Sequence, residues 1–377
     1  MIPKFAPTFY IICLLIFLNG CRPGNTNSQK TEIQKPNENP NKFEPTDGVL
    51  LFVGQELEAV GKVKGYEDGY LNHFPKPAGW TTYTNISPKN EKPGGYIQEA
   101  LDGLWETDNW GDGESNAMLQ HLDPDFTNMA LAIGLEFVNN EEKIADGTHD
   151  QYIEKLGDFL LELGKRPVFL RIAYEFDGDP WNHYDRISTV KAYRRIVDIL
   201  RKKGVENTAY VWQSTGFISN QEQLEGWYPG DDYVDWCGTS FFNRWKEIEM
   251  FEFARKKGKP VFIAEATPAV SDYGAKLYGN GKEIQLNNSD QAKEAWDKWF
   301  LPLFDTIEKN RDVIKAVSYI NCHWDSHPMW QDNPLFKGID ARLNLSKEIR
   351  DQWIKRTSSK PFILSSENLY NDLYNNK

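Results

Sequence analysis

Eight short apolar runs, rich in β-branched and aromatic residues, follow one another along this chain and constrain its fold more than any other feature. The runs cover residues 49–53, 79–84, 127–133, 167–172, 208–213, 233–239, 260–264 and 314–320. Amphipathic segments with apolar residues at helical spacing separate several of them, at residues 151–163, 190–200, 247–257 and 291–308. Strands that alternate with helices form parallel βαβ units, and eight such units close into a barrel. The sequence therefore predicts an α/β fold with a single TIM barrel over residues 46–360 and a C-terminal tail over residues 361–377.

A doubly wound open sheet is the competing architecture for such an alternation of strands and helices. That fold usually carries a glycine-rich phosphate loop directly after its first strand. Here the first strand is followed by Gly54-Gln55-Glu56, which lacks that pattern. The barrel is therefore the favoured prediction.

The first twenty residues have the features of a secretion signal. Lys4 supplies the positive start, and residues 11–18 form an apolar run that is too short to span a bilayer. The run ends in Gly20-Cys21, which resembles the bacterial lipobox, where cleavage before the cysteine leaves a thiol to be lipidated. We expect residues 21–45, which are rich in Asn, Pro, Lys, Ser and Thr, to form a disordered tether.

These features predict a protein anchored by lipid to the bacterial cell envelope, at the outer membrane and facing either the periplasm or the surface. The alternative is an ordinary signal peptide followed by an incidental cysteine. Once Cys13 and Cys21 are set aside, Cys237 and Cys322 remain. We expect both to be small buried hydrophobic side chains rather than a disulfide pair.

The composition limits the partners of the barrel. A net charge of −12, with no basic stripe, excludes a nucleic-acid partner and favours an uncharged substrate. The 13 Trp, 17 Tyr and 21 Phe residues suit the apolar faces of sugar rings as well as they suit a core. We expect a monomer without a cofactor.

A glutamate follows two of the eight runs, Glu175 within residues 166–178 and Glu265 within residues 259–268. The carboxyl ends of barrel strands converge on the face that holds the active site. Two carboxyl groups there can cleave a glycosidic bond if one is protonated and the other ionised. The aromatic neighbours of Glu175 disfavour its charged form, and Arg171 is expected to keep Glu265 ionised. A single glutamate of this kind would more simply be a solvated or salt-bridged strand end.

Three motifs in order resemble those of glycoside hydrolase family 26, a family of clan A. Residues 171–178 are similar to its fourth-strand motif, in which an arginine precedes a His-Glu pair followed by Asn-Gly. Residues 227–238 match the approach to its sixth strand, and residues 259–265 match its seventh. The resemblance covers most of residues 47–355. It implies that Glu175 is the general acid/base and Glu265 the nucleophile of a retaining glycosidase.

The resemblance also implies a set of substrate contacts. Trp212 and Trp324 fall where such enzymes carry sugar-facing aromatic residues. We expect further contacts with the substrate from Arg171, Tyr174, Asp177, Trp181, Phe242, Trp80 and Trp110. Gln55, Glu56 and His73 are expected either to line the cleft or to pack in the core.

The chain departs from the family pattern at three positions. Tyr174 replaces a histidine, Asp177 replaces an asparagine, and Phe242 replaces a tyrosine that hydrogen-bonds the nucleophile in the family. A phenyl ring cannot donate a hydrogen bond. Either Tyr174 or Arg171 therefore orients Glu265, or the chain is a divergent branch with a different substrate.

His323, Asp325 and His327 have a spacing that could hold zinc, but no third His or Cys stands at motif distance. We therefore expect no metal there and assign the neighbouring Trp324 and Trp330 to a subsite wall.

The predicted function is a lipid-anchored retaining glycoside hydrolase that cleaves a β-linked polysaccharide, of β-mannan or β-1,3-xylan type, by double displacement. Two alternatives remain open at the level of sequence. One is a clan A hydrolase of another family that acts on β-glucan. The other is a non-catalytic carbohydrate-binding lipoprotein on a decayed barrel.

Overall fold

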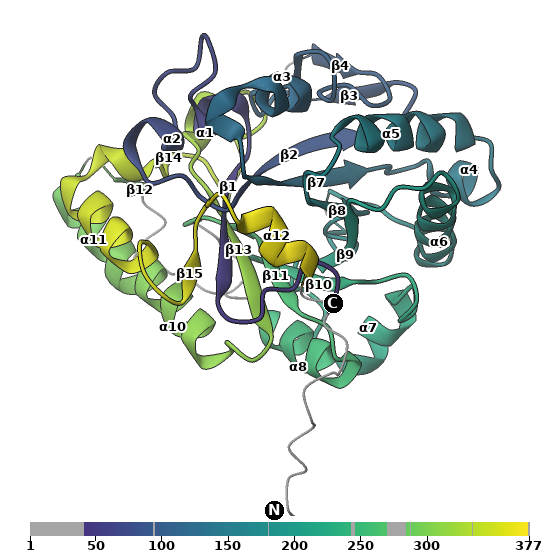
Figure 1. Ribbon diagram of the computed structural model, residues 1–377. Coiled ribbons are helices and arrows are strands. Elements are labelled where there is room, and N and C mark those ends of the chain that lie inside the picture. Colours follow the sequence, from purple (N-terminus) through teal and green to yellow (C-terminus); the bar gives the residue numbers. More distant parts are fainter. Residues whose placement is uncertain are drawn as a thin grey trace, which may run out of the picture. The chain divides into compact units, whose positions relative to one another are not determined.

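The eight expected strands close into one parallel barrel in the computed structural model of the chain (Figure 1). The structure describes residues 41–92, 95–179, 181–242, 246–269, 284–286, 288–333 and 335–375. The barrel strands are β1 (Val49–Gly54), β2 (Gly79–Asn85), β7 (Ala130–Glu136), β8 (Val168–Ile172), β9 (Thr208–Ser214), β10 (Trp236–Phe241), β11 (Val261–Ala266) and β13 (Ile314–Ile320). They are hydrogen-bonded in this order, and β13 pairs back with β1, opposing Ala316 to Leu50.

Helices surround the barrel on its outside (Figure 1). They are α3 (Ala117–Leu122), α4 (Glu141–Ala145), α5 (Asp150–Glu162), α6 (Arg186–Lys202), α7 (Gln221–Trp227), α8 (Glu247–Lys257), α9 (Ser289–Ala295), α10 (Leu301–Lys309) and α11 (Lys347–Thr357). The four expected helical segments are confirmed as α5, α6, α8 and the α9–α10 pair, which the π-helical turn η4 (Trp296–Phe300) joins. α5 and α6 each bury one apolar face, which is why their sequences carry apolar residues at helical spacing.

Short elements fill the connections at the ends of the barrel. The β1–β2 connection holds α1 (Leu57–Val60) and α2 (Tyr70–His73). The long β2–β7 connection holds two small hairpins, β3 (Asn90–Lys92) with β4 (Tyr96–Gln98) and β5 (Asp108–Asn109) with β6 (Glu114–Ser115), and then α3 and η2 (Pro124–Phe126). β12 (Ile284–Gln285) pairs with β14 (Ile339–Asp340), and η5 (Trp324–Ser326) and η6 (Leu343–Leu345) follow β13.

Aromatic rings fill the lower part of the barrel interior. Phe52, Phe169 and Phe262 come from three different strands, and their ring centroids lie 5.0–5.9 Å from one another. Gly79 begins β2 beside this cluster, because a Cβ atom there would lie 2.2 Å from the ring of Phe52. This packing closes the interior as a core, so the barrel is not a pore.

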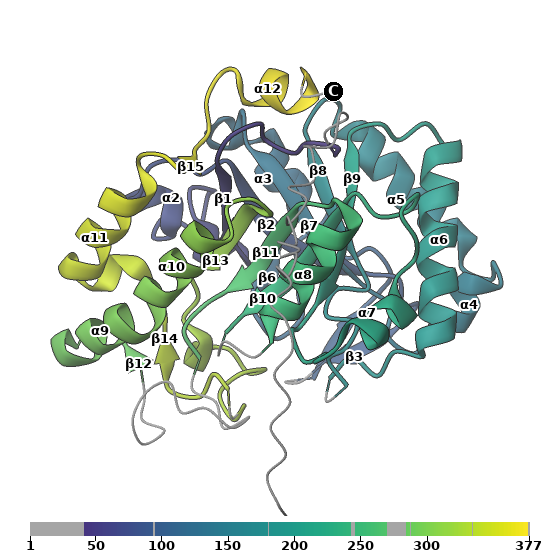
Figure 2. The same cartoon turned by 90° about the horizontal axis from the view of Figure 1, so that it is seen from below.

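The base of the barrel is covered by both ends of the described chain. Residues 361–377 were expected as a tail, but β15 (Phe362–Ile363) pairs with β1, and α12 (Leu369–Asn375) buries Leu369 and Leu373. Figure 2 shows α12 at one end of the barrel and β12 and β14 toward the other. Phe43, which was assigned to the tether, is also buried here, 5.9 Å from the ring of Phe169. The folded part therefore begins a few residues earlier than expected and includes most of the expected tail.

The expected signal, lipid-anchor cysteine Cys21 and most of the tether lie outside the described residues. No helix within the described ranges has the length and apolar character needed to cross a bilayer. Cys237 and Cys322 are free and buried, as expected.

Candidate active site

A cleft of about 390 Å³ opens at the carboxyl ends of the barrel strands, and both expected glutamates, Glu175 and Glu265, line it. Aromatic residues form a large part of its wall: Tyr83, Trp110, Tyr174, Trp181, Phe242, Trp324, Trp330 and Phe336. Its polar members include Gln55, Asn182 and the ion pair between Lys92 and Glu136, whose Nζ and Oε2 atoms lie 2.6 Å apart. A cleft with aromatic walls and a few polar groups is typical of a site that binds a small organic molecule or a sugar chain.

Glu175 lies in a tight turn that begins where β8 ends. Two residues of this turn, Ala173 and Glu175, have positive φ angles of 49° and 54°, a conformation that costs free energy for residues other than glycine. Hydrogen bonds fix the turn: Asn182 Nδ2 donates to the carbonyl oxygens of Tyr174 and Glu175, and the amide of Phe176 donates to Gln213 O over 3.2 Å. The strained backbone directs the Glu175 side chain into the cleft.

The carboxyl group of Glu175 is buried, and two neutral donors bind it. Ser240 Oγ donates to Oε1 over 2.6 Å, and Trp181 Nε1 donates to Oε2 over 2.9 Å. Burial and the charge of Glu265 raise the pKa of Glu175, the two hydrogen bonds lower it, and the net result is a pKa of about 8. Glu175 is therefore protonated at neutral pH and can act as a proton donor.

Glu265 has the opposite surroundings, because Arg171 forms a buried ion pair with it. The guanidinium group of Arg171 is fully buried, and its Nε donates to Gln213 Oε1 over 2.7 Å. Removing one partner of such a pair would leave a buried charge without a counter-ion. The pair therefore favours an ionised Glu265 at the edge of the cleft.

A β-bulge in β11 turns Glu265 toward the cleft. Phe262 and Ala264 pack in the barrel interior, and Ile263 packs on the outside, so strict alternation would point residue 265 outward. The pairings of β11 with β10 and with β13 both shift register after Ile263. An extra residue in one strand redirects the side chains that follow it, and such bulges are common beside active sites.

The hydroxyl group that faces Glu265 belongs to Tyr83, a residue that the sequence did not single out. Arg171 Nη1 donates to Tyr83 Oη over 3.3 Å, which leaves the hydroxyl proton free to be donated to Glu265. Burial raises the pKa of Tyr83 well above its ordinary value, and the hydrogen bond to Glu265 contributes in the same direction. Tyr83 lies opposite Gly134 in the sheet, where a Cβ atom would come within 2.4 Å of the tyrosine ring.

The two expected alternatives for orienting Glu265 have different outcomes. Arg171 contacts the carboxylate directly, as expected. Tyr174 instead places its ring over the guanidinium group of Arg171, with 5.0 Å between the guanidinium carbon and the ring centroid. Phe242 lines the cleft, and its ring meets the edge of Phe336 at 5.6 Å.

Four residues expected at the substrate have other positions. Arg171 is fully buried beneath the cleft. Trp212 is stacked on Phe176 at 4.6 Å in the helix layer, because its neighbour Val211 takes the inward position on β9. Trp80 is buried outside the barrel and donates from Nε1 to Gln120 over 2.9 Å. These three side chains were expected to contact the substrate directly and do not line the cleft.

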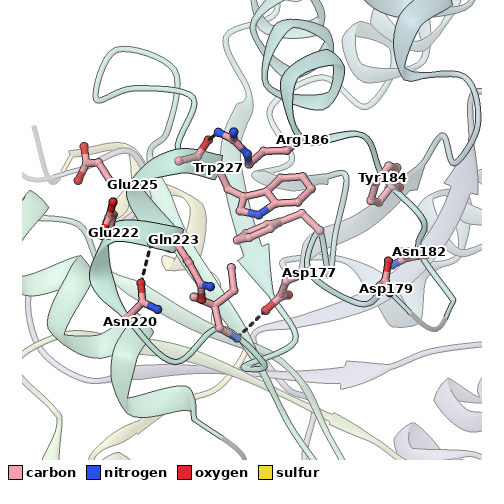
Figure 3. A pocket seen from close by; sticks show the side chains of 13 residues that line it. Asp177, Asp179, Asn182, Tyr184, Arg186, Asn220, Glu222, Gln223, Glu225 and Trp227 are labelled. Carbon is pink, nitrogen blue, oxygen red and sulfur yellow. Dashed lines mark hydrogen bonds between the residues drawn. The ribbon is translucent and has the colours of Figure 1, made fainter.

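Asp177 is the fourth of these residues, and it holds a loop. Its carboxylate accepts hydrogen bonds from Ser214 Oγ over 2.6 Å and from the backbone amides of Thr215, Phe217 and Ile218. It also borders a second pocket of about 1000 Å³ between the Glu175 turn and α7, together with Asn220 and Trp227 (Figure 3). The remaining expected contacts, Tyr174, Trp181, Phe242, Trp324 and Trp110, all line the cleft.

The family described as glycosyl hydrolase family 26 matches residues 128–324. A beta-1,3-xylanase of an Alcaligenes species is 32% identical over 340 residues, which cover 87% of this chain and 67% of that protein. The beta-1,3-xylanase TXYA of a Vibrio species is 30% identical over 346 residues, which cover 88% and 69%. A solved GH26 beta-mannanase from Bacteroides ovatus has the same fold, with a TM-score of 0.55, 16% identity, and coverage of 87% of this chain and 93% of that one.

Proposed function

The chain belongs to glycosyl hydrolase family 26 and is a glycosidase, and we propose that it hydrolyses β-1,3-xylan with retention of anomeric configuration. In this proposal Glu175 is the general acid/base and Glu265 is the nucleophile. The observation that carries it is the contrast between two buried carboxyl groups at one cleft. Burial raises the pKa of Glu175 to about 8, whereas Glu265 is ion-paired with Arg171. Such a division of environments separates the acid from the nucleophile in retaining glycosidases.

The first step forms a glycosyl-enzyme. The protonated carboxyl group of Glu175 gives its proton to the glycosidic oxygen as the bond to the anomeric carbon breaks. The carboxylate of Glu265 attacks that carbon from the opposite face and forms the new ester bond. Arg171 and Tyr83 hold the attacking carboxylate in place until the ester bond forms and its negative charge is lost.

The second step releases the sugar. Glu175, now ionised, removes a proton from a water molecule that attacks the anomeric carbon. The ester bond to Glu265 breaks, and its carboxylate returns to the ion pair with Arg171. Because each step inverts the anomeric carbon, the product keeps the β configuration.

The choice of β-1,3-xylan is supported by the two relatives with that name, which are 32% and 30% identical over most of the chain. The mannanase similarity, at 16% identity, concerns the fold alone. The cleft wall adds a chemical argument. Phe242, Leu335 and Phe336 give the wall an apolar stretch, which suits a xylose unit because that unit lacks the exocyclic hydroxymethyl group of a hexose.

A panel of polysaccharides tests this proposal. Purified protein is incubated with β-1,3-xylan, β-1,4-mannan and β-glucan, and the release of reducing ends is measured, with Glu265→Ala as the control. The proposal predicts that β-1,3-xylan is hydrolysed fastest and that the control is inactive on all three. Faster hydrolysis of mannan or glucan would contradict the assigned substrate. Binding of xylan without hydrolysis would support a carbohydrate-binding role instead.

We also propose that the protein is anchored to the cell envelope through a lipid on Cys21. The support is the sequence alone: a short apolar run, the Gly20-Cys21 pair and a polar segment before the barrel. Such a tether would hold the cleft near the membrane while leaving it free to meet a polymer.

A further inference from the structure

Behind one wall of the cleft, three buried side chains from distant parts of the chain come together. Glu56 follows β1, Cys322 follows β13, and His327 follows η5. Their potential ligand atoms all lie within 4.8 Å of one another. All three residues are buried, with exposed fractions of 1%, 0% and 7%. None of them has a part in the proposed hydrolysis.

One nitrogen of the His327 imidazole ring is available to bind a metal ion. Its Nε2 is buried and has no hydrogen-bond partner among the described residues. The atom points toward Glu56, with 3.8 Å between Nε2 and Oε1. A buried polar atom without a partner is unfavourable, and each such atom in a native protein calls for an explanation.

The same region holds a second buried carboxyl group. Asp112 is fully buried beside Glu56, and its two carboxylate oxygens accept from the side chains of Gln55 and Trp330. Within the described ranges, neither carboxyl group forms an ion pair with a lysine or an arginine. A buried carboxyl group is ionised at little cost only when a cation is paired with it or bound to it.

We propose that Glu56, Cys322 and His327 form a binding site for a divalent transition-metal cation, for which zinc is the expected ion. A thiolate, an imidazole nitrogen and a carboxylate oxygen are the three ligand types that zinc takes in proteins. Calcium and magnesium prefer oxygen ligands, and a cysteine would be a poor one for either. Tetrahedral bonds of about 2.0–2.3 Å place ligand atoms roughly 3.3–3.8 Å apart, so the most distant pair of the trio must approach by about 1 Å. Binding releases the thiol proton of Cys322 and any proton on Glu56, and the carboxyl group of Asp112 lies beside Glu56.

Gly113 makes the approach of two ligands possible. A Cβ atom at this position would lie 2.7 Å from Cγ of Glu56 and 3.4 Å from Cε1 of His327. The amide of Met329 donates to Gly111 O over 3.0 Å, so the segment after η5 is already joined to this loop. Trp110, Met329 and Trp330 of these segments line the cleft. The cation would therefore fasten a cleft wall to the end of β1, which is a structural role.

This trio differs from the group suggested by local spacing. His323 lies 3.7 Å from Asp340, and Asp325 accepts a hydrogen bond from the amide of Gly338. Only His327 of that group belongs to the site, and its two partners come from elsewhere in the fold.

Metal titration of the untagged full-length protein tests the proposal. After treatment with a chelator, the protein is titrated with Zn²⁺ and with Co²⁺. We expect one equivalent of each to bind, an increase of several degrees in Tm with Zn²⁺, and thiolate-to-metal charge-transfer absorption with Co²⁺. Cys322→Ser and His327→Gln should each weaken Zn²⁺ binding by at least about 100-fold. Cys237→Ser, which alters a buried thiol elsewhere, and His323→Gln, which alters a neighbouring histidine, should bind as wild type does.

Three outcomes would overturn the proposal: no stoichiometric binding to the wild-type protein, Co²⁺ binding without thiolate absorption, or unchanged affinity in Cys322→Ser and His327→Gln. The Co²⁺ spectrum of the wild-type protein decides the matter even if a variant does not fold.

Discussion

Gln213 Nε2 donates a hydrogen bond to Ser240 Oγ over 3.1 Å, and this contact joins the surroundings of the two cleft glutamates. On one side Gln213 accepts from Arg171, the ion-pair partner of Glu265. On the other side Ser240 donates to Glu175 over 2.6 Å. One buried chain of side chains therefore connects the proposed nucleophile to the proposed acid. Arg171, Gln213 and Ser240 come from the successive strands β8, β9 and β10.

Tyr83→Phe tests whether Tyr83 takes over the hydrogen bond to the nucleophile that a tyrosine at the position of Phe242 makes in the family. Removing the hydroxyl takes one hydrogen-bond donor away from Glu265, which keeps its ion pair with Arg171. A hydrogen bond to a charged group contributes about 1.5–3 kcal/mol, so kcat should fall roughly 10- to 100-fold. KM should change little, because the hydroxyl contacts an enzyme group. The matched control is Tyr193→Phe. The hydroxyl of Tyr193 is buried and has no hydrogen-bond partner in the described part of the chain. Equal kinetics for the two variants would remove Tyr83 from the mechanism.

Ser240→Ala tests the control of the acid by its hydrogen bonds. The hydrogen bond from Ser240 lowers the pKa of Glu175, which burial raises to about 8. Removing it should raise that pKa further. Because the acid works only when protonated, kcat/KM falls as the pH rises through this pKa. The alkaline limb of the pH profile of kcat/KM should therefore move to higher pH in the variant.

The control for this shift is Ser214→Ala. Ser214 lies at the end of β9, next to the strand of Ser240, and its hydroxyl donates to Asp177 rather than to Glu175. Its alkaline limb should stay with that of the wild-type enzyme. An alkaline limb that stays in place, or moves to lower pH, in Ser240→Ala would mean that another group sets it.

Phe43→Ala tests whether the barrel base extends into the expected tether. Phe43 is 2% exposed, and its ring meets that of Tyr374 at 5.0 Å. Emptying a buried aromatic position costs about 3–5 kcal/mol, so Tm should fall by roughly 5–15 °C while kcat is unchanged. Leu122→Ala, at a residue that is 73% exposed, is the control and should melt as wild type does. An unaltered Tm for Phe43→Ala would show that the base is stable without this ring.

Cys21→Ser tests the proposed lipid anchor. Without the thiol no lipid can be attached. The polar tether expected over residues 21–45 has no other strong affinity for a membrane. The variant should move from the membrane fraction to the soluble fraction of cells, with the activity of the purified barrel unchanged. A membrane fraction that keeps the variant would exclude Cys21 as the anchor.

The barrel could be predicted from the sequence because each of its strands is a separate apolar run. All eight runs became strands, although β7 and β10 each begin three residues after the expected start, 127 and 233. The two glutamates could be predicted because each closely follows such a run. Parallel strands present their carboxyl ends to one face whatever the details of packing.

The residues around the glutamates could not be predicted in the same way. Tyr83 and Arg171 meet across 88 positions of sequence, and no local pattern marks the tyrosine. Trp212 was assigned to the sugar, but the inward place of Val211 turns it outward. The bulge that redirects Glu265 breaks the alternation on which such assignments depend. The direction of each side chain is thus set by register, which only the assembled barrel defines.

The most direct test of the two-glutamate mechanism is chemical rescue with azide on an activated aryl β-glycoside. Glu265→Ala should be inactive alone, and azide should take the place of the nucleophile and give the α-glycosyl azide. Glu175→Ala should still form the glycosyl-enzyme, since the aryl leaving group needs little protonation, and azide should then give the β-glycosyl azide. The anomeric configuration of each azide product, read by NMR, is the deciding measurement. An α-azide from Glu265→Ala with a β-azide from Glu175→Ala is the predicted result, and the reverse pair, or an active Glu265→Ala without azide, would contradict the assigned roles.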